Sequence, residues 1–93
     1  MHVFSVQFHL HLPSQSLKGK RGIVKSILAR ARNSFNVSAA EVGLHDVHGS
    51  TRLAFVTVGE DPVKARRVLE QLEEWLVDER PDIDIVDVYI EAR

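Results

Sequence analysis

The stretch from Val3 to Arg32 most strongly constrains the fold of this chain, because a strand-like segment leads directly into a basic, helix-like one. Apolar side chains occupy every second position of the first segment and polar side chains lie between them: Phe4, Val6, Phe8, Leu10 and Leu12 alternate with Ser5, Gln7, His9 and His11. A period of two is typical of a β-strand with one buried face. We therefore expect this strand to lie against the core.

The segment after Pro13-Ser14-Gln15 predicts a helix that begins behind Ser16, whose hydroxyl is suited to cap the first turn. Its apolar residues recur at spacings of three and four, which gives a stripe facing the core: Leu17, Ile23, Val24, Ile27, Leu28 and Ala31. Asn33-Ser34 ends the helix. Lys18, Lys25 and Arg32 follow one another at intervals of seven on its polar flank.

The rest of the chain predicts three further strands and a second helix. A strand is expected over 36–44, and one over 52–58 that is apolar on both faces and so belongs in the middle of a sheet. Asp61 and Pro62 start the second helix as N-cap and first helical residue, and Pro81 stops it. The last strand is expected over 83–90.

This order of elements, β-α-β-β-α-β, predicts an α+β fold of the ferredoxin-like type. Right-handed crossovers then give a four-stranded antiparallel sheet in the order 4-1-3-2, with two helices on one face. Ninety-three residues are enough for one core, so we expect residues 1–93 to form a single domain.

Composition excludes several classes of protein. A hydrophobic fraction of 44% with 27% charged residues is typical of a soluble globular chain, and no apolar run approaches the about 20 residues that a membrane span needs. The chain has no cysteine, which excludes disulfides and thiolate metal sites and fits a reducing cytoplasm. We expect a cytoplasmic protein.

Charge is distributed unevenly along the chain. All acidic residues lie after position 40, whereas six of the twelve basic residues lie before it. Such asymmetry is typical of a face that binds nucleic acid or an acidic partner. The alternative is that the two helices, or two subunits of a dimer, carry complementary charge.

The basic turn at the start of the first helix is the most functional-looking feature. Lys18, Lys20 and Arg21 stand at a helix N-terminus, where free amides and the helix dipole favour an anion, and Lys25 follows one turn later. We expect these four residues to bind phosphate, with RNA or the ribosome as the partner. The alternative is a solvated turn whose lysines point away from any ligand.

The sheet face without helices is a competing site. We expect Leu53, Phe55, Ile85 and Tyr89 to lie on it as an apolar patch that a second subunit covers. The alternative function is therefore a homodimeric protein-interaction or small-ligand-binding module.

Metal and catalytic sites are less well supported. The predicted topology gathers His9, His11, His45 and His48 near one sheet edge, together with Asp46, but no tight ligand motif is present. Nor does the chain hold a nucleophile elbow, a phosphate loop or a dinucleotide-binding glycine pattern. We expect a non-catalytic domain without catalytic residues, cofactor or metal.

Three segments resemble the YlxP-like family of small bacterial proteins: Ser-Leu-Lys-Gly-Lys-Arg at 16–21, Arg-Asn-Ser-Phe-Asn-Val-Ser at 32–38 and Ala-Glu-Val-Gly at 40–43. The resemblance covers nearly the whole chain, although the family typically has glutamate where this chain has Gly19. It implies a ferredoxin-like domain, often encoded among genes for translation and ribosome maturation. It therefore suggests an accessory role near RNA or the ribosome, and it brings no catalytic residues.

Overall fold

The computed structural model describes residues 1–93 as four strands and two helices. In chain order these are β1 (His2–His11), α1 (Leu17–Ser34), β2 (Ser38–Gly43), β3 (Ser50–Gly59), α2 (Pro62–Glu79) and β4 (Asp84–Ala92). The strands form one sheet in the order β2-β3-β1-β4, and every neighbouring pair is antiparallel. The predicted α+β fold, the element order and the strand order are therefore confirmed.

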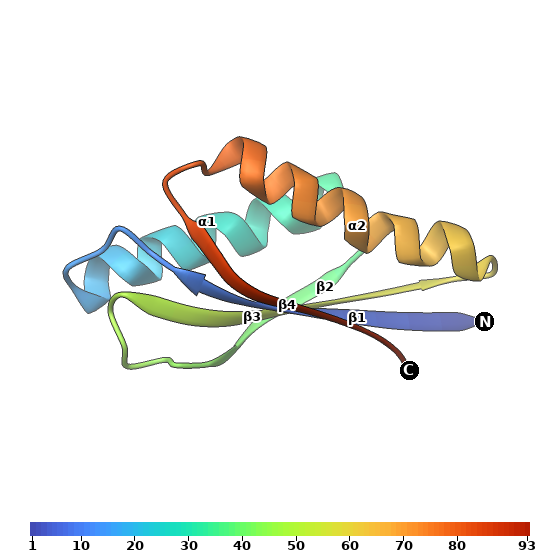
Figure 1. The fold of residues 1–93 in the computed structure, drawn as a ribbon, viewed down its shortest axis with the longest axis horizontal. Helices are drawn as coiled ribbons and strands as arrows, with labels where there is room; N and C mark the ends of the chain where they lie inside the picture. Colours follow the sequence, from blue (N-terminus) through green and yellow to red (C-terminus); the bar gives the residue numbers. More distant parts are fainter.

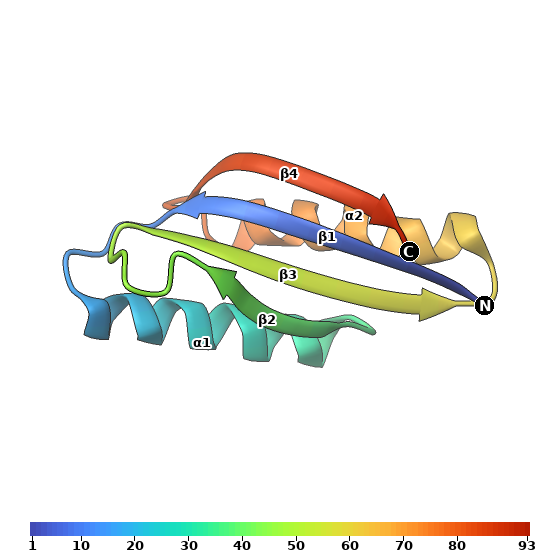
Figure 2. The same ribbon diagram turned by 90° about the horizontal axis from the view of Figure 1, so that it is seen from below.

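Both helices lie on one face of the sheet, and the other face is uncovered (Figure 1). Figure 2 shows that α1 runs alongside the edge strand β2, whereas α2 lies behind β1 and β4. β1 and β3 are the central strands, as their apolar character indicates. Neither helix is long and apolar enough to cross a lipid bilayer.

Both helix starts form as the sequence predicts. The Ser16 hydroxyl accepts the Gly19 amide at 3.0 Å. The Asp61 carboxylate accepts the amides of Val63 and Lys64 at 2.9 and 3.1 Å, and Pro62 is the first residue of α2. Each cap satisfies amides that the first helical turn leaves unpaired, which fixes where the chain enters the helix.

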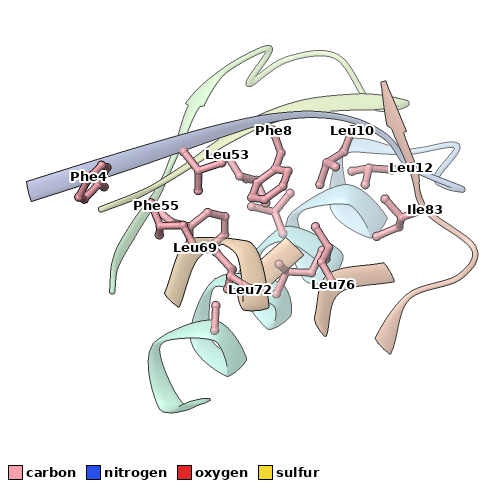
Figure 3. Packing of buried hydrophobic residues seen from close by; sticks show 14 of the residues in the cluster. Phe4, Phe8, Leu10, Leu12, Leu53, Phe55, Leu69, Leu72, Leu76 and Ile83 are labelled. Carbon is pink, nitrogen blue, oxygen red and sulfur yellow. The ribbon is translucent and has the colours of Figure 1, made fainter. Parts of the chain in front are cut away.

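The core lies between the sheet and the helices (Figure 3). β1 contributes its alternate residues, and the edge of the Phe8 ring packs against Phe55 of β3 with centroids 5.8 Å apart. α2 covers them with Leu69, Leu72 and Leu76, and α1 adds Val24, Ile27 and Ala31. This apolar burial is the main term that stabilises the fold.

The predicted exposure of Leu53 and Phe55 is wrong. Both are buried in the core, because Leu53 pairs with Phe8 and Phe55 with Val6. Directly paired residues of antiparallel strands share a face, so the inward face of β1 sets the inward face of β3. The β3 sequence did not show this, since apolar residues occupy both of its faces.

Ile85 is also turned inward. It pairs with Leu10, beside an irregularity in the register of β1 with β4, and packs against the core. Of the four residues expected on the uncovered face, Tyr89 alone lies there. It pairs with the outward Gln7, and 56% of it is exposed.

Candidate functional site

A basic groove of about 460 Å³ lies between α1 and the edge strand β2. We call it the α1–β2 groove, and it is lined by Lys20, Arg21, Val24, Lys25, Leu28, Ala29, Arg32 and Glu41. Four of these eight residues are cations and one is an acid. Three of the four predicted phosphate-binding residues therefore lie on this groove, and Lys18 lies one turn before Arg21 on α1.

Lys20 is buried at the bottom of the groove, with 1% of its side chain exposed. Its ammonium group donates to the backbone oxygens of Leu44 and, at 3.2 Å, His45. It also lies 3.1 Å from the Glu41 carboxylate. These three oxygens use the hydrogen-bonding capacity of an ammonium group, so Lys20 has none left for a ligand. We therefore remove it from the proposed phosphate contacts.

Glu41 completes this buried network. The Thr51 hydroxyl donates to Oε2 of Glu41 at 2.5 Å, the same oxygen that faces Lys20. Burial by itself raises the pKa of Glu41. The hydrogen bonds from Thr51 and Lys20, with the positive charges of Lys20 and His45, outweigh burial and lower that pKa below its ordinary value of 4.5. Glu41 is therefore the ionised partner of Lys20 at neutral pH.

The network also holds an uncommon backbone turn. Leu44 has a φ of 59°, which lies in the left-handed region that residues other than glycine and asparagine rarely adopt. Its carbonyl oxygen is one of the acceptors of the Lys20 ammonium. Lys20 thus ties the first turns of α1 to the end of β2 and fixes the path of the β2–β3 connection.

The pKa of Glu41 predicts a pH dependence of stability. A carboxylate whose pKa is lowered in the folded state stabilises the fold above its unfolded pKa, and this contribution is lost as the pH falls through the folded value. At pH 7 we expect Glu41→Gln to lower the free energy of unfolding by about 2 kcal/mol, since it removes a charged hydrogen-bond acceptor. The difference from the wild type should shrink steadily below pH 4.5, as denaturant titrations at several pH values would measure. A difference that stays constant down to pH 3 would argue against this role of Glu41.

The other three cations predicted to bind phosphate point to solvent. Lys18, Arg21 and Lys25 are exposed, and none of them takes part in an ion pair of the structure. With a rise of about 1.5 Å per residue, they cover about 10 Å of the helix. These three side chains are the free positive charges of the candidate site.

Arg32 extends this basic flank, although it was not among the residues predicted from the sequence to bind phosphate. Its Nη2 donates to the Ala39 carbonyl of β2 at 2.7 Å, which fixes the side chain across the far part of the groove. The sequence feature that could have identified Arg32 is its position seven residues after Lys25, because this spacing places both residues on one side of a helix. Arg30 does not line the groove. Its Nη2 forms an ion pair with Oε2 of Glu79 at 2.6 Å, which joins α1 to α2.

The amide end of α1 is already occupied by the protein itself. The Ser16 hydroxyl accepts a hydrogen bond from the Gly19 amide. A Cβ at Gly19 would lie 3.0 Å from the Ser14 hydroxyl oxygen and 3.2 Å from that of Ser16. The chain's own turn therefore packs where a ligand would have approached Gly19. The helix flank, rather than the helix end, is the better site for an anion.

Gly22 offers a clean control on α1, because a Cβ there would meet no atom within 4 Å. Alanine is favoured over glycine inside a helix by about 1 kcal/mol. We expect Gly22→Ala to raise the free energy of unfolding by about 0.5–1 kcal/mol and to leave anion binding unchanged. Thermal unfolding with and without RNA would measure both quantities. A loss of binding would instead mean that a ligand approaches the backbone at Gly22.

The histidines do not come together as a metal site. His48 contacts the Ser14 carbonyl through Nδ1 at 3.3 Å, and His45 contacts the Glu41 carbonyl through Nε2 at 3.2 Å. His9 and His11 lie on the uncovered sheet face with ring centroids 5.6 Å apart. No group of three or more histidine, aspartate or glutamate side chains, Asp46 included, is arranged to hold a metal ion.

A second hollow, of about 550 Å³, lies on the outer side of α2. It is lined by four acids and one valine: Glu70, Glu73, Glu74, Asp78 and Val77. An acidic lining repels phosphate, so this hollow is no alternative anion site. The two helices thus present surfaces of opposite charge on the same side of the sheet.

Comparison with known proteins agrees with the resemblance seen in the sequence. Residues 3–90 match the model of a family described as protein of unknown function (DUF503). The chain is also 35% identical over 69 residues to the uncharacterized protein YlxP of Bacillus subtilis (strain 168). That alignment covers 74% of this chain and 74% of the relative.

Proposed function

Given that the chain belongs to the DUF503 family of proteins of unknown function, we propose that it is a non-catalytic domain that binds RNA phosphates along the α1–β2 groove. The observation that carries this proposal is the set of exposed, unpaired cations Lys18, Arg21 and Lys25 on one flank of α1. A helix without any acid over 17–34 leaves their charge uncompensated along its length.

The geometry supports a backbone contact rather than a small-molecule pocket. The cations follow one another along a helix instead of converging on one point, which suits the regular charges of a nucleic-acid strand. The groove offers no aromatic side chain on which a base could stack, since its apolar lining consists of Val24, Leu28 and Ala29. We therefore expect binding that depends on charge and shape and depends little on base sequence.

Association with the ribosome and a cytoplasmic location belong to the same proposal. Both rest on the resemblance to the YlxP-like family and on the absence of cysteine, which suits a reducing compartment. Ribosomal RNA supplies dense, structured phosphate surfaces of the kind that a basic helix flank fits.

The test is binding of the full chain to a labelled structured RNA and to ribosomal subunits over a range of salt concentrations. If three cations neutralise phosphates, the logarithm of the association constant should fall with the logarithm of salt concentration with a slope of about −2. The affinity should then drop by about twentyfold between about 50 and 200 mM salt. An absence of binding at the lowest salt concentration would refute the proposal.

A further inference from the structure

Large and small side chains are distributed unevenly over the uncovered face of the sheet. Figure 2 views the strands from the side of this face. The edge strand β2 exposes Ser38 and Ala40 on it, which pair with Val56 and Ala54 of β3. The opposite edge strand, β4, exposes Asp87, Tyr89 and Glu91, which pair with His9, Gln7 and Ser5 of β1. The β2 edge of this face therefore carries short side chains and the β4 edge carries long ones. We call them the low edge and the high edge.

The central strands show the same contrast at one pair of residues. Gln7 on β1 lies beside Ala54 on β3, so a long side chain adjoins a short one. Two residues along, Ser5 lies beside Val56, but the Arg93 side chain covers Ser5 and donates from Nε to its hydroxyl at 3.0 Å. In the other direction His9 and Arg52 are both long, so Gln7 and Ala54 are the central pair in which a long side chain adjoins an uncovered short one.

Charge is also distributed unevenly between the two edges of this face. The acids Asp87 and Glu91 lie on β4, where Glu91 is paired with Arg93 at 3.0 Å and Asp87 has no ion pair; Arg52, which is also unpaired, lies on β3. The Arg52 side chain leans toward β2, because a Cβ at Gly43 would lie 3.0 Å from its Cδ and 3.3 Å from its Cβ. The glycine leaves space for the stem of this arginine, and the positive charge is carried to the low edge.

We propose that a second copy of this chain packs against the uncovered sheet face. The two-fold axis runs parallel to the strands, between β1 and β3, so that β4 of each copy lies over β2 of the other and β1 over β3. Tyr89 then projects onto Ala40 of the partner subunit, and Asp87 meets Arg52 of the partner subunit. Gln7 likewise faces Ala54 of the partner subunit.

The charges select this axis over the other symmetric arrangement. A two-fold axis perpendicular to the strands would stack β4 on β4 and β3 on β3, so that Asp87 and Arg52 would not face each other. The parallel axis instead joins these two unpaired, opposite charges twice. Large side chains then also meet small ones, which is the condition for close packing between two sheets.

The size of the face fits such a dimer. Strands of up to 10 residues in a four-stranded sheet give a flat face of roughly 600 Å² before side chains are counted. A standard interface buries about 800 Å² per partner, which a sheet with projecting side chains approaches. The α1–β2 groove lies with the helices, away from this interface, so the inference goes beyond the proposed function and does not depend on it.

A charge exchange tests the proposal. Sedimentation of the wild type should give twice the 10.5 kDa mass of the chain. Arg52→Asp should weaken the dimer on the order of a hundredfold, because two aspartates then oppose each other at both ends of the interface. Arg52→Asp/Asp87→Arg should restore it, since opposite charges meet again. Within one chain β1 separates these two residues, so the rescue reports on contact between copies.

Each other result would overturn the inference. A monomeric wild type would do so, and so would a dimer that Arg52→Asp leaves intact or that the double exchange fails to restore. The matched control is Arg21→Glu, a charge reversal on the far side of the molecule, which should leave the mass unchanged. Circular dichroism of every variant separates loss of the dimer from loss of the fold.

Discussion

Lys20→Met is expected to lower the free energy of unfolding by about 3–5 kcal/mol, the usual cost of breaking a buried ion pair by removing one partner. Methionine retains the length of the side chain and removes its charge. The Glu41 carboxylate and the Leu44 and His45 carbonyl groups would then lose the donor that satisfies them. A loss of this size is a large part of the about 5–15 kcal/mol that stabilises a typical domain.

Two further variants make this prediction specific. Lys25→Met makes the same chemical change at an exposed, unpaired lysine of α1, and its effect should stay within about 0.5 kcal/mol. Lys20→Met/Glu41→Met removes both charges and should be more stable than Lys20→Met alone. Urea titrations at pH 7 measure all three variants. Equal stability of Lys20→Met and Lys25→Met would contradict the buried role of Lys20.

Lys18→Glu/Arg21→Glu/Lys25→Glu is expected to weaken RNA binding on the order of a hundredfold and to abolish most of its salt dependence. None of the three residues forms an ion pair, so the changes break no salt bridge of the fold. Acids near the beginning of a helix interact favourably with its dipole. The variant should therefore be at least as stable as the wild type while it loses its ligand.

The matched control reverses three cations of the other helix, Lys64→Glu/Arg66→Glu/Arg67→Glu. It changes the net charge by the same amount at a site away from the α1–β2 groove. If binding arises from the groove, this control should keep most of the wild-type affinity. Equal losses in both triple variants would mean that net charge, and no particular surface, determines binding.

The fold was predictable because its strongest signals are local. The period of two in β1 and the two helix caps each depend on a few adjacent residues, and all three form as expected. The orientation of β3 was not predictable in this way. Its apolar residues occupy both faces, so pairing with β1, a contact distant in sequence, decides that Leu53 and Phe55 point inward.

The site was predictable only in part, for a similar reason. The sequence shows that positive charge gathers at the start of α1, but it does not show which cations the protein uses internally. Lys20 is not free to bind a ligand, because it contacts Glu41 and the carbonyl of Leu44, 24 residues away along the chain. Arg32 is added because β2 lies beside the end of α1 and offers the Ala39 carbonyl. Both outcomes depend on tertiary neighbours.

The most direct test of the central claim is an NMR titration of the ¹⁵N-labelled wild-type protein with a structured RNA at low salt. We expect amide shift changes concentrated around Lys18, Arg21, Lys25 and Arg32 on α1 and around residues 39–41 on β2, and we expect these changes to reverse as salt is added. Shifts confined to the uncovered sheet face, around Tyr89 and Ala54, would contradict the claim, as would a spectrum that RNA leaves unchanged.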